Sequence, residues 1–438
     1  MFKKVLPLSL ILSLRFLGLF LVLPVLSIYA LTLDGATPML VGIIVGGYAL
    51  TQAIFQIPFG TMSDKIGRKP TLLVGLIIFL VGSLVAGYAT DIYTLMVGRF
   101  LQGAGAIGSV ITAMIADLVE EKTRGHAMAI MGGFIAMSFA VAMGVGPVIG
   151  AHYGVSTLFF ITAGLSVVAM ILLFTKVPTP PKIIHIYHQT SKISDILKDR
   201  NLLNMVVINA MQKGLMTISF VLIPIILTGD EFGWEKTELW KVYAPAMFIG
   251  LMAMGPAAVF GEKKNKPKQI FLASIVLFSV SFAIMGLTTS SNIFIVGVVA
   301  FFVAFNMMEP LVQSMISKFA KVHQKGAALG VANSAAYFST FLGGTFAGVM
   351  LSYTDRQSIG IVLAIITILW LFWTFSLQNP IKHSHLFIPM ADVNMDKLKE
   401  LESEHIAEWF INDTEKVVVV KYNPAKLAED EIKSQILH

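Results

Sequence analysis

Four charged side chains lie inside long apolar stretches of this sequence: Arg15, Arg99, Lys213 and Glu309. A charge at the centre of a membrane-spanning helix costs about 2.5 to 3.5 kcal/mol on insertion scales, so such residues usually face an interior passage. Glu309 is the only carboxylate well inside any of these stretches, and it directly precedes Pro310. Because burial disfavours the charged form of a carboxylate, Glu309 could load and release a proton within the membrane.

The depth of the basic residues separates their expected roles. Lys213 lies roughly 18 Å into its apolar stretch at 1.5 Å per residue, which places it near the midplane. We hypothesise that Lys213 and Glu309 interact there, while Arg99 and Gln102 polarise the same passage. Arg15 lies only one or two turns inside, where snorkelling to the membrane surface is an equally good interpretation. Three basic groups against one acid favour an anionic or neutral solute over a lipophilic cation.

The composition indicates a membrane protein. Hydrophobic residues make up 56% of the 438 residues and charged residues only 13%, about half the share usual in soluble domains. The chain has no cysteine, which excludes disulfides and thiolate chemistry, and no phosphate-binding loop motif occurs. We therefore expect no enzyme activity, no cofactor and no metal site. The net charge of +6 arises in the membrane part, which argues against a nucleic-acid partner.

Apolar stretches of about 20 residues can cross a bilayer core, and twelve occur here. They are expected near 8–33, 39–60, 70–89, 92–116, 125–151, 157–177, 201–228, 239–260, 268–288, 292–317, 325–351 and 357–378. The fold class is thus an all-α membrane protein with twelve transmembrane helices. The first stretch is too long for the core of a signal peptide and is interpreted as a retained helix.

The distribution of Lys and Arg predicts the orientation. Alternate connecting segments hold 19 basic residues, whereas the opposite set holds three. Cytoplasmic loops retain basic residues, so both chain ends are expected in the cytoplasm.

A weak internal repeat with an offset of about 200 residues divides the membrane part in two. "GRKPTLLVG" after the second span aligns with "KNKPKQIFL" after the eighth, and "KTRGHAMAI" aligns with "HQKGAALGV". Such parallel repeats are typical of transporters whose site lies between two halves. We predict an N-terminal six-helix half (1–177), a cytoplasmic linker (178–200), a C-terminal six-helix half (201–378) and a small separate domain (383–438).

Three motifs resemble the major facilitator superfamily. The loop "FGTMSDKIGRKP" matches the family's signature between helices 2 and 3 at Gly60, Asp64, Gly67, Arg68 and Lys69. "RFLQGAGA" resembles the helix 4 motif that contains Arg99 and Gln102. "GVGPVIG" resembles the helix 5 motif of antiporters through Gly146, Pro147 and Gly150, although Ala151 replaces the motif's second glycine.

The resemblance is closest to the YajR-like transporters, a group described as drug and proton antiporters. It is carried by "SLRFLGLFLVLPVLSIYA", "YALTQAIFQIPFG", "FFVAFNMMEPLVQSMISK" and the small C-terminal domain. The resemblance implies a multi-pass protein of the bacterial inner membrane that exports a small molecule in exchange for protons. It also implies that helices 1, 4, 7 and 10 line the central cavity, and each of these carries one of the four charges.

The resemblance further implies a gate on the cytoplasmic side. Asp64 would lie against the N-terminus of helix 11, where the helix dipole favours an anion, in a cluster with Arg68 and Asp117. This cluster would hold the two halves together and break when they rock. Gly60 and Gly67 are expected to permit close approach and a tight turn. Lys69 adds positive charge that keeps the loop cytoplasmic.

The C-terminal residues predict a small α+β domain. The expected order is strand 385–390, helix 395–403, strands 406–413 and 416–422, and helix 424–437. This order resembles a ferredoxin-like domain without its last strand. The exposed sheet edge would favour self-association, and the domain's net negative charge would favour docking on the basic loops.

Two other functions fit the sequence. A positive cavity favours uptake or exchange of a small organic anion. A membrane-embedded sensor that binds a ligand without net transport is the second, because the second-half copy of the loop signature, "FGEKKNKPK", lacks its aspartate and its Gly-Arg pair.

Overall fold

The computed structural model describes residues 2–119, 121–178, 193–321, 324–380, 384–394, 397–398, 406–412, 416–422, 424 and 426–437. Within these residues, twelve helical segments are long and apolar enough to cross a membrane, as predicted. They comprise α1 (Phe2–Leu21) with α2 (Leu23–Ala30), α3 (Pro38–Ile66), α4 (Arg68–Gly87), α5 (Ile92–Ala104) with α6 (Gly108–Leu118), α7 (Glu121–Tyr153), α8 (Val155–Thr175), α10 (Arg200–Thr228), η1 (Lys236–Glu238) with α11 (Trp240–Ala258) and η2 (Val259–Lys263), α12 (Pro267–Leu287), α13 (Ser291–Phe319), α14 (Lys325–Tyr353) and α15 (Arg356–Thr374). A short helix, α9 (Ile193–Lys198), precedes α10.

Two predicted spans are broken rather than continuous. The first is interrupted at Val22, between α1 and α2, just before Pro24, which has no N–H to donate to the preceding turn. The fourth is interrupted at 105–107, between α5 and α6. A Cβ at Gly105 would lie 2.3 Å from the carbonyl oxygen of Gly75, so α4 and α5 approach too closely there for any side chain.

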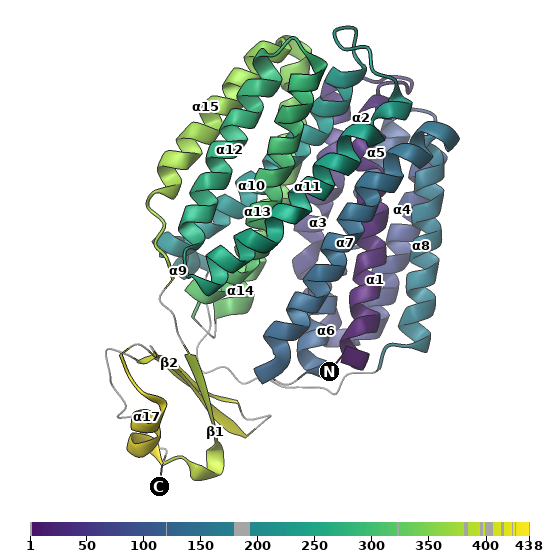
Figure 1. The fold of residues 1–438 in the computed structure, drawn as a ribbon. Coiled ribbons are helices and arrows are strands. Elements are labelled where there is room, and N and C mark those ends of the chain that lie inside the picture. Colours follow the sequence, from purple (N-terminus) through teal and green to yellow (C-terminus); the bar gives the residue numbers. More distant parts are fainter. Residues whose placement is uncertain are drawn as a thin grey trace.

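The helices form two groups, which we call the N-terminal half (α1–α8) and the C-terminal half (α10–α15). Figure 1 shows the purple and blue helices of the first group side by side, with the green helices of the second group beside them. The N-terminus and the C-terminal domain lie at one end of the bundle, which we call the basic end because the loops 65–69 and 263–268 lie there. The opposite end, which carries the loops 31–37, 88–91 and 229–238, is the far end.

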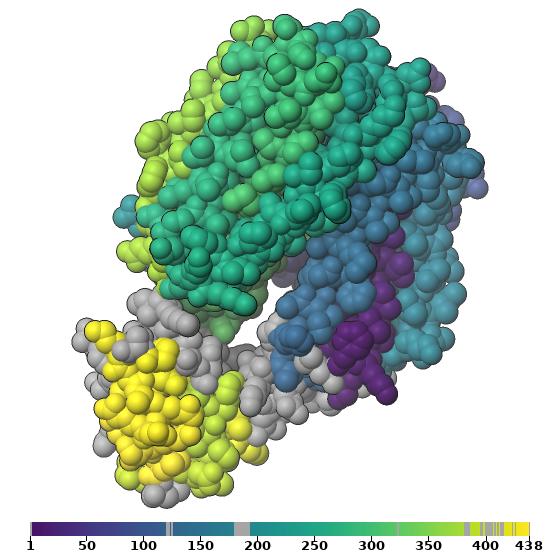
Figure 2. Space-filling model, viewed as in Figure 1, coloured from purple at the N-terminus to yellow at the C-terminus, as the bar shows by residue number. Residues whose placement is uncertain are grey.

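The halves pack tightly against each other toward the far end. A Cβ added to Gly42 on α3 would lie 2.1 Å from the carbonyl oxygen of Gly344 on α14, and Gly46 and Gly348 lie in the same close contact. Ser27 on α2 also donates a hydrogen bond to the carbonyl of Phe220 on α10. Toward the basic end the halves separate, and Figure 2 shows a hollow between them there. The bundle is therefore closed at the far end and open at the basic end.

The C-terminal residues form a three-stranded antiparallel sheet in the order β1-β3-β2. Its elements are β1 (Ser384–Pro389), η4 (Met390–Asp392), β2 (Ile406–Asn412), β3 (Val417–Tyr422) and α17 (Glu429–Ile436). The three predicted strands are confirmed. The predicted helix 424–437 is wrong in length, because α17 begins at Glu429, where three consecutive acidic residues favour a helix N-terminus. The predicted helix 395–403 lies largely outside the described residues.

Candidate functional site

An ion pair joins α10 and α13 at mid-membrane depth. Lys213 Nζ donates to both carboxylate oxygens of Glu309, at 2.9 Å to Oε1 and 2.8 Å to Oε2. Gln212 Nε2 donates to Glu309 Oε2 and to the carbonyl of Phe305, both at 3.0 Å. The Lys213 and Glu309 side chains are 24% and 35% exposed. The predicted contact between Lys213 and Glu309 is present, and both side chains are partly exposed at the surface of the C-terminal half.

Two long helices place this pair. Asp199 caps α10, since its side chain accepts hydrogen bonds from the backbone N–H groups of Asn201 and Leu202. The helix α13 continues through Pro310 to Phe319 without a break. Glu309 therefore lies on a continuous helix, in which Pro310 removes one N–H donor.

An aromatic bridge connects this pair to the other half. Lys213 Nζ lies 4.9 Å from the centroid of the Phe305 ring. That ring lies 5.9 Å from Phe139 on α7, which also contacts Phe220 on α10 at 6.1 Å and Phe20 on α1 at 4.9 Å. Because Phe139 belongs to the N-terminal half, these rings close the space between the halves on the far-end side of the ion pair.

Arg15 and Arg99 lie in a separate cluster of the N-terminal half, against which Tyr337 on α14 of the C-terminal half packs beside Arg15 and Gln52. Arg99 Nη1 donates to Gln102 Oε1 at 2.7 Å, and its guanidinium lies 4.7 Å from the centroid of the Tyr48 ring. Arg15 Nη2 donates to Gln52 Oε1 at 3.1 Å. Arg15 is 1% exposed and Arg99 is fully buried. Arg15 therefore does not snorkel to the membrane surface, and neither arginine lines the hollow between the halves.

Close packing of α5 on α3 explains this arrangement. A Cβ at Gly103 would lie 1.8 Å from the carbonyl oxygen of Tyr48, so only glycine lets α5 bring Arg99 and Gln102 so near to α3. Gln102 in turn donates to Ser83 Oγ on α4 at 2.9 Å. Some donors stay without a partner in the described structure, namely Arg15 Nε and Nη1 and Arg99 Nη2. The cluster is a buried cationic core that Tyr337 of the C-terminal half helps to cover.

At the basic end of the N-terminal half, Arg68 forms ion pairs with two acidic side chains. Its Nη1 donates to Asp64 Oδ1 at 2.6 Å and its Nε to Asp117 Oδ2 at 2.9 Å. Gly67 adopts φ +98°, a conformation that favours glycine, as the tight-turn prediction required. The expectation for Gly60 is wrong, because a Cβ there would meet nothing closer than Ser109 Oγ at 3.9 Å.

The gate across the halves stays a prediction. The described contact of Asp64 is with Arg68 in its own half, and the Asp64 side chain is 65% exposed. No contact between Asp64 and the start of α14 is described. In a structure open at the basic end, this is the arrangement that a released gate would have.

The basic end of the C-terminal half contains a counterpart of the Arg68–Asp117 ion pair in which the positions of the acid and the base are exchanged. Glu262 on η2 accepts a hydrogen bond from Lys318 Nζ at 2.8 Å and contacts the Ser314 hydroxyl. Sequence reasoning registered only the basic residues of "FGEKKNKPK" and missed this pair. The spacing of about 200 residues between Asp117 and Lys318 is the signal that could have shown it.

The antiporter-like motif on α7 positions the first helix. A Cβ at Gly146 would lie 2.2 Å from the carbonyl oxygen of Leu21, at the junction of α1 and α2, and Gly150 contacts Val25. Pro147 lies inside α7, which continues through it. The motif thus lets α7 pack closely against the break in the first span.

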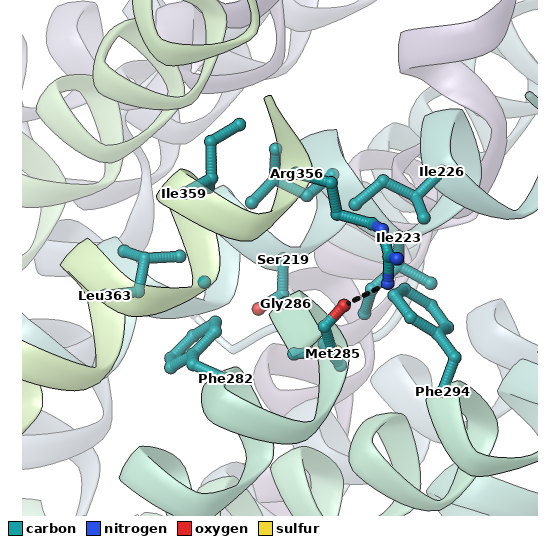
Figure 3. Close-up of a pocket in the computed structure, with 12 residues that line it drawn as sticks. Ser219, Ile223, Ile226, Phe282, Met285, Gly286, Phe294, Arg356, Ile359 and Leu363 are labelled. Carbon is teal, nitrogen blue, oxygen red and sulfur yellow. Dashed lines mark hydrogen bonds between the residues drawn. The ribbon is translucent and has the colours of Figure 1, made fainter. Parts of the chain in front are cut away.

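The far end of the C-terminal half contains a small apolar cavity of about 20 Å³. Ser219 on α10 is one of its lining residues, and Figure 3 shows Arg356 donating a hydrogen bond to the Met285 carbonyl beside it. Arg356 also pairs with Glu231 at 2.5 Å. This volume has room for about one water molecule, so the cavity is too small to hold a solute.

The described residues contain no group of three His, Asp or Glu side chains that could hold a metal ion.

These features define a membrane transporter with two helical halves. The family model of the Major Facilitator Superfamily matches residues 8–343 and 263–411, and the chain belongs to this family. It is 35% identical to the inner membrane transport protein YajR of Escherichia coli over 97% of this chain and 95% of that protein. It is 23% identical to multidrug resistance protein 2 of Bacillus subtilis, over 76% of this chain and 85% of that protein.

Solved structures share the fold at low sequence identity. A bacterial homologue of the human lysosomal transporter Spinster, in an inward-facing and occupied conformation, aligns with a TM-score of 0.69 at 14% identity, covering 85% of this chain and 95% of that chain. The nucleoside transporter NupG aligns with a TM-score of 0.65 at 15% identity, covering 86% and 99%.

Proposed function

We propose that this protein is a secondary active transporter that exports a small molecule in exchange for protons by alternating access. The observation that carries the proposal is the Lys213–Glu309 ion pair, held at 2.8 Å within the membrane and partly exposed. A carboxylate that pairs with a lysine in one state and binds a proton in another is suited to coupling proton movement to transport. When Glu309 binds a proton, Lys213 loses its counter-ion, and the two protonation states then favour different arrangements of the halves.

The packing of the halves supports alternating access. The glycine contacts of α3 with α14 and the aromatic bridge at Phe139 close the far end. The Arg68 cluster and the Glu262–Lys318 pair lie at the open end. In the proposed cycle, the far-end contacts open as Asp64 meets the start of α14 and closes the basic end.

The charge distribution supports the orientation. The basic end, which carries the N-terminus and the C-terminal domain, would face the cytoplasm of a bacterial cell, with both termini inside. The protein would sit in the inner membrane, like the related inner membrane transport protein YajR of Escherichia coli. The sheet order β1-β3-β2 supports a ferredoxin-like domain, whose edge strands would allow self-association.

Relatives favour efflux as the direction of transport. Besides multidrug resistance protein 2, the chain is 30% identical to a class E tetracycline resistance protein of Escherichia coli over 51% of this chain and 58% of that protein. Uptake of an organic anion receives less support, because the two arginines that favoured it are buried away from the hollow.

The test measures proton movement in proteoliposomes that contain the purified protein. Wild type, Glu309→Gln and Glu231→Gln are compared while tetracycline and a panel of other drugs are added, with internal pH as the readout. Glu231 is a matched control, since it is also a carboxylate paired with a cation but lies at the far end. Drug-dependent proton flux should occur in wild type and Glu231→Gln and be absent from Glu309→Gln.

Unchanged flux in Glu309→Gln would remove Glu309 from the mechanism. Drug binding by wild type without any proton movement would instead favour the sensor function.

A further inference from the structure

Three carboxamide side chains meet one helical turn from the ion pair, on the side of the basic end. Asn209 precedes Lys213 by four residues on α10, and Gln313 follows Glu309 by four residues on α13, so each shares a helix face with its charged neighbour. Asn333 on α14 joins them. Gln313 Nε2 donates to Asn333 Oδ1 at 3.0 Å, and Asn209 Nδ2 donates to the same oxygen at 3.4 Å.

This carboxamide cluster has unused hydrogen-bonding capacity. Asn209 Oδ1 and Gln212 Oε1 are buried acceptors without a partner in the described structure, and their residues are 1% and 0% exposed. The described hydrogen bonds of Asn333 use only its oxygen and leave its amide N–H groups free. A buried acceptor without a partner is costly. Donors and acceptors are thus both available at this position.

Two members of the cluster are accessible, whereas Asn209 is buried. Gln313 is exposed and Asn333 is partly buried, although both lie within membrane-spanning helices. The nearby charges cancel, because Lys213 and Glu309 pair with each other. The two arginines that would attract an anion are buried in this structure, with Tyr337 of α14 packed beside their cluster.

We propose that Asn209, Gln313 and Asn333 form the substrate's hydrogen-bonding subsite, and that the substrate carries there an uncharged polar group with adjacent donor and acceptor atoms. Carboxamides recognise such groups through paired hydrogen bonds and provide no net charge for an ion. A lipophilic cation would find no unpaired carboxylate here, and an organic anion would find no unpaired cation. This inference deepens the proposed function and rests on the hollow being the transport path.

Thermal stabilisation of the purified protein in detergent tests the substrate class. Three compound sets of matched mass are compared: uncharged solutes rich in donors and acceptors, including nucleosides; lipophilic cations, including tetraphenylphosphonium; and organic anions, including benzoate. Stabilisation should come from the uncharged set. Stabilisation confined to either charged set, or none from any uncharged compound, would overturn the proposal.

Variants then locate the site. The uncharged compound that stabilises most should bind at least about tenfold more weakly to Asn333→Leu and Gln313→Leu, because the remaining amides lose their partner. Asn204→Leu is the control, since Asn204 lies on α10 but bonds to Arg200 and Ser376 instead. The exposed position of Gln313 makes its variant the safer one for folding. Equal affinity of Gln313→Leu and wild type would contradict the assignment.

This binding assay uses no proton gradient. Loss of binding in Gln313→Leu would therefore support the subsite even if Glu309→Gln left proton flux unchanged, so the two proposals can fail separately.

Discussion

The two halves carry their membrane-embedded charges on corresponding helices but treat them in opposite ways. In the N-terminal half, Arg15 and Arg99 are buried among amides and aromatic rings, one of which, Tyr337, belongs to α14 of the other half. The C-terminal half pairs Lys213 with Glu309 and leaves both partly exposed. A buried charge without access to solvent supports the packing of this arrangement, whereas an accessible acid paired with a base can exchange protons. The comparison assigns the scaffold to one half and the proton chemistry to the other.

The largest expected difference between the two clusters is in their accessibility to a thiol reagent. Because the chain contains no cysteine, single-cysteine variants report one position each. Gln313→Cys, at an exposed site of the C-terminal half, should react readily with a membrane-impermeant maleimide added from the basic-end side. Ser83→Cys, which is buried beside Gln102, should react at least about a hundredfold more slowly, because it requires local opening. Similar rates would show that the N-terminal cluster is not sealed.

The arginine cluster and the Lys213–Glu309 pair should also differ in how much they contribute to the free energy of unfolding. Arg99→Ala removes a buried side chain and leaves Gln102 Oε1 without its donor, which should lower the free energy of unfolding by about 3 kcal/mol. Lys213→Ala should cost only about 1 kcal/mol, because the partly exposed Glu309 carboxylate can bind water instead. Thermal unfolding in detergent measures both. A larger loss for Lys213→Ala would reverse the assignment of scaffold and chemistry.

The clusters at the basic end extend the comparison. Arg68 is 17% exposed and holds two acids, whereas Lys318 is 38% exposed and holds Glu262. Arg68→Ala should therefore lower the free energy of unfolding by about 1 to 2 kcal/mol, and Lys318→Ala by about 0.5 kcal/mol. Transport should fall more in Arg68→Ala as well. Equal losses in the two variants would indicate that the halves contribute alike to this end of the bundle.

The smallest expected effect concerns two helix caps. Asp91, at the start of α5, accepts hydrogen bonds from Tyr93 N and from both the backbone and the hydroxyl of Thr94. The Thr94 hydroxyl contributes most to lowering the pKa of the Asp91 carboxyl, and Ser358 does the same for Asp355 at the start of α15. Asp91→Ala should reduce thermal stability slightly more than Asp355→Ala, since Asp91 makes more bonds.

The pH dependence of these caps follows from the direction of the shift. Carboxyls whose pKa is lowered on folding stabilise the protein above their ordinary value, near 3.8, and this stability is lost as the pH falls through the lowered value. The difference between wild type and Asp91→Ala should therefore be present at neutral pH and vanish in strong acid. A difference that grows in acid would contradict the capping role.

Much of the fold could be predicted from the sequence, because membrane spans depend on long apolar runs and local charge. The pairing of Lys213 with Glu309 was also predictable, since two isolated opposite charges at similar depth have few alternative partners. The sealed state of Arg15 and Arg99 was not, because it depends on how closely α5 approaches α3 at Gly103. The breaks beside Val22 and Gly105 and the Glu262–Lys318 pair also depend on packing between distant segments.

The central claim is that Glu309 takes up and releases a proton. Infrared difference spectra of the protein in lipid, recorded as the transported drug is added, report this directly through the carbonyl band of a protonated carboxyl group. The account predicts a band that changes on drug addition in wild type and in Glu262→Gln and is absent from Glu309→Gln. The same drug-dependent band in Glu309→Gln would contradict it.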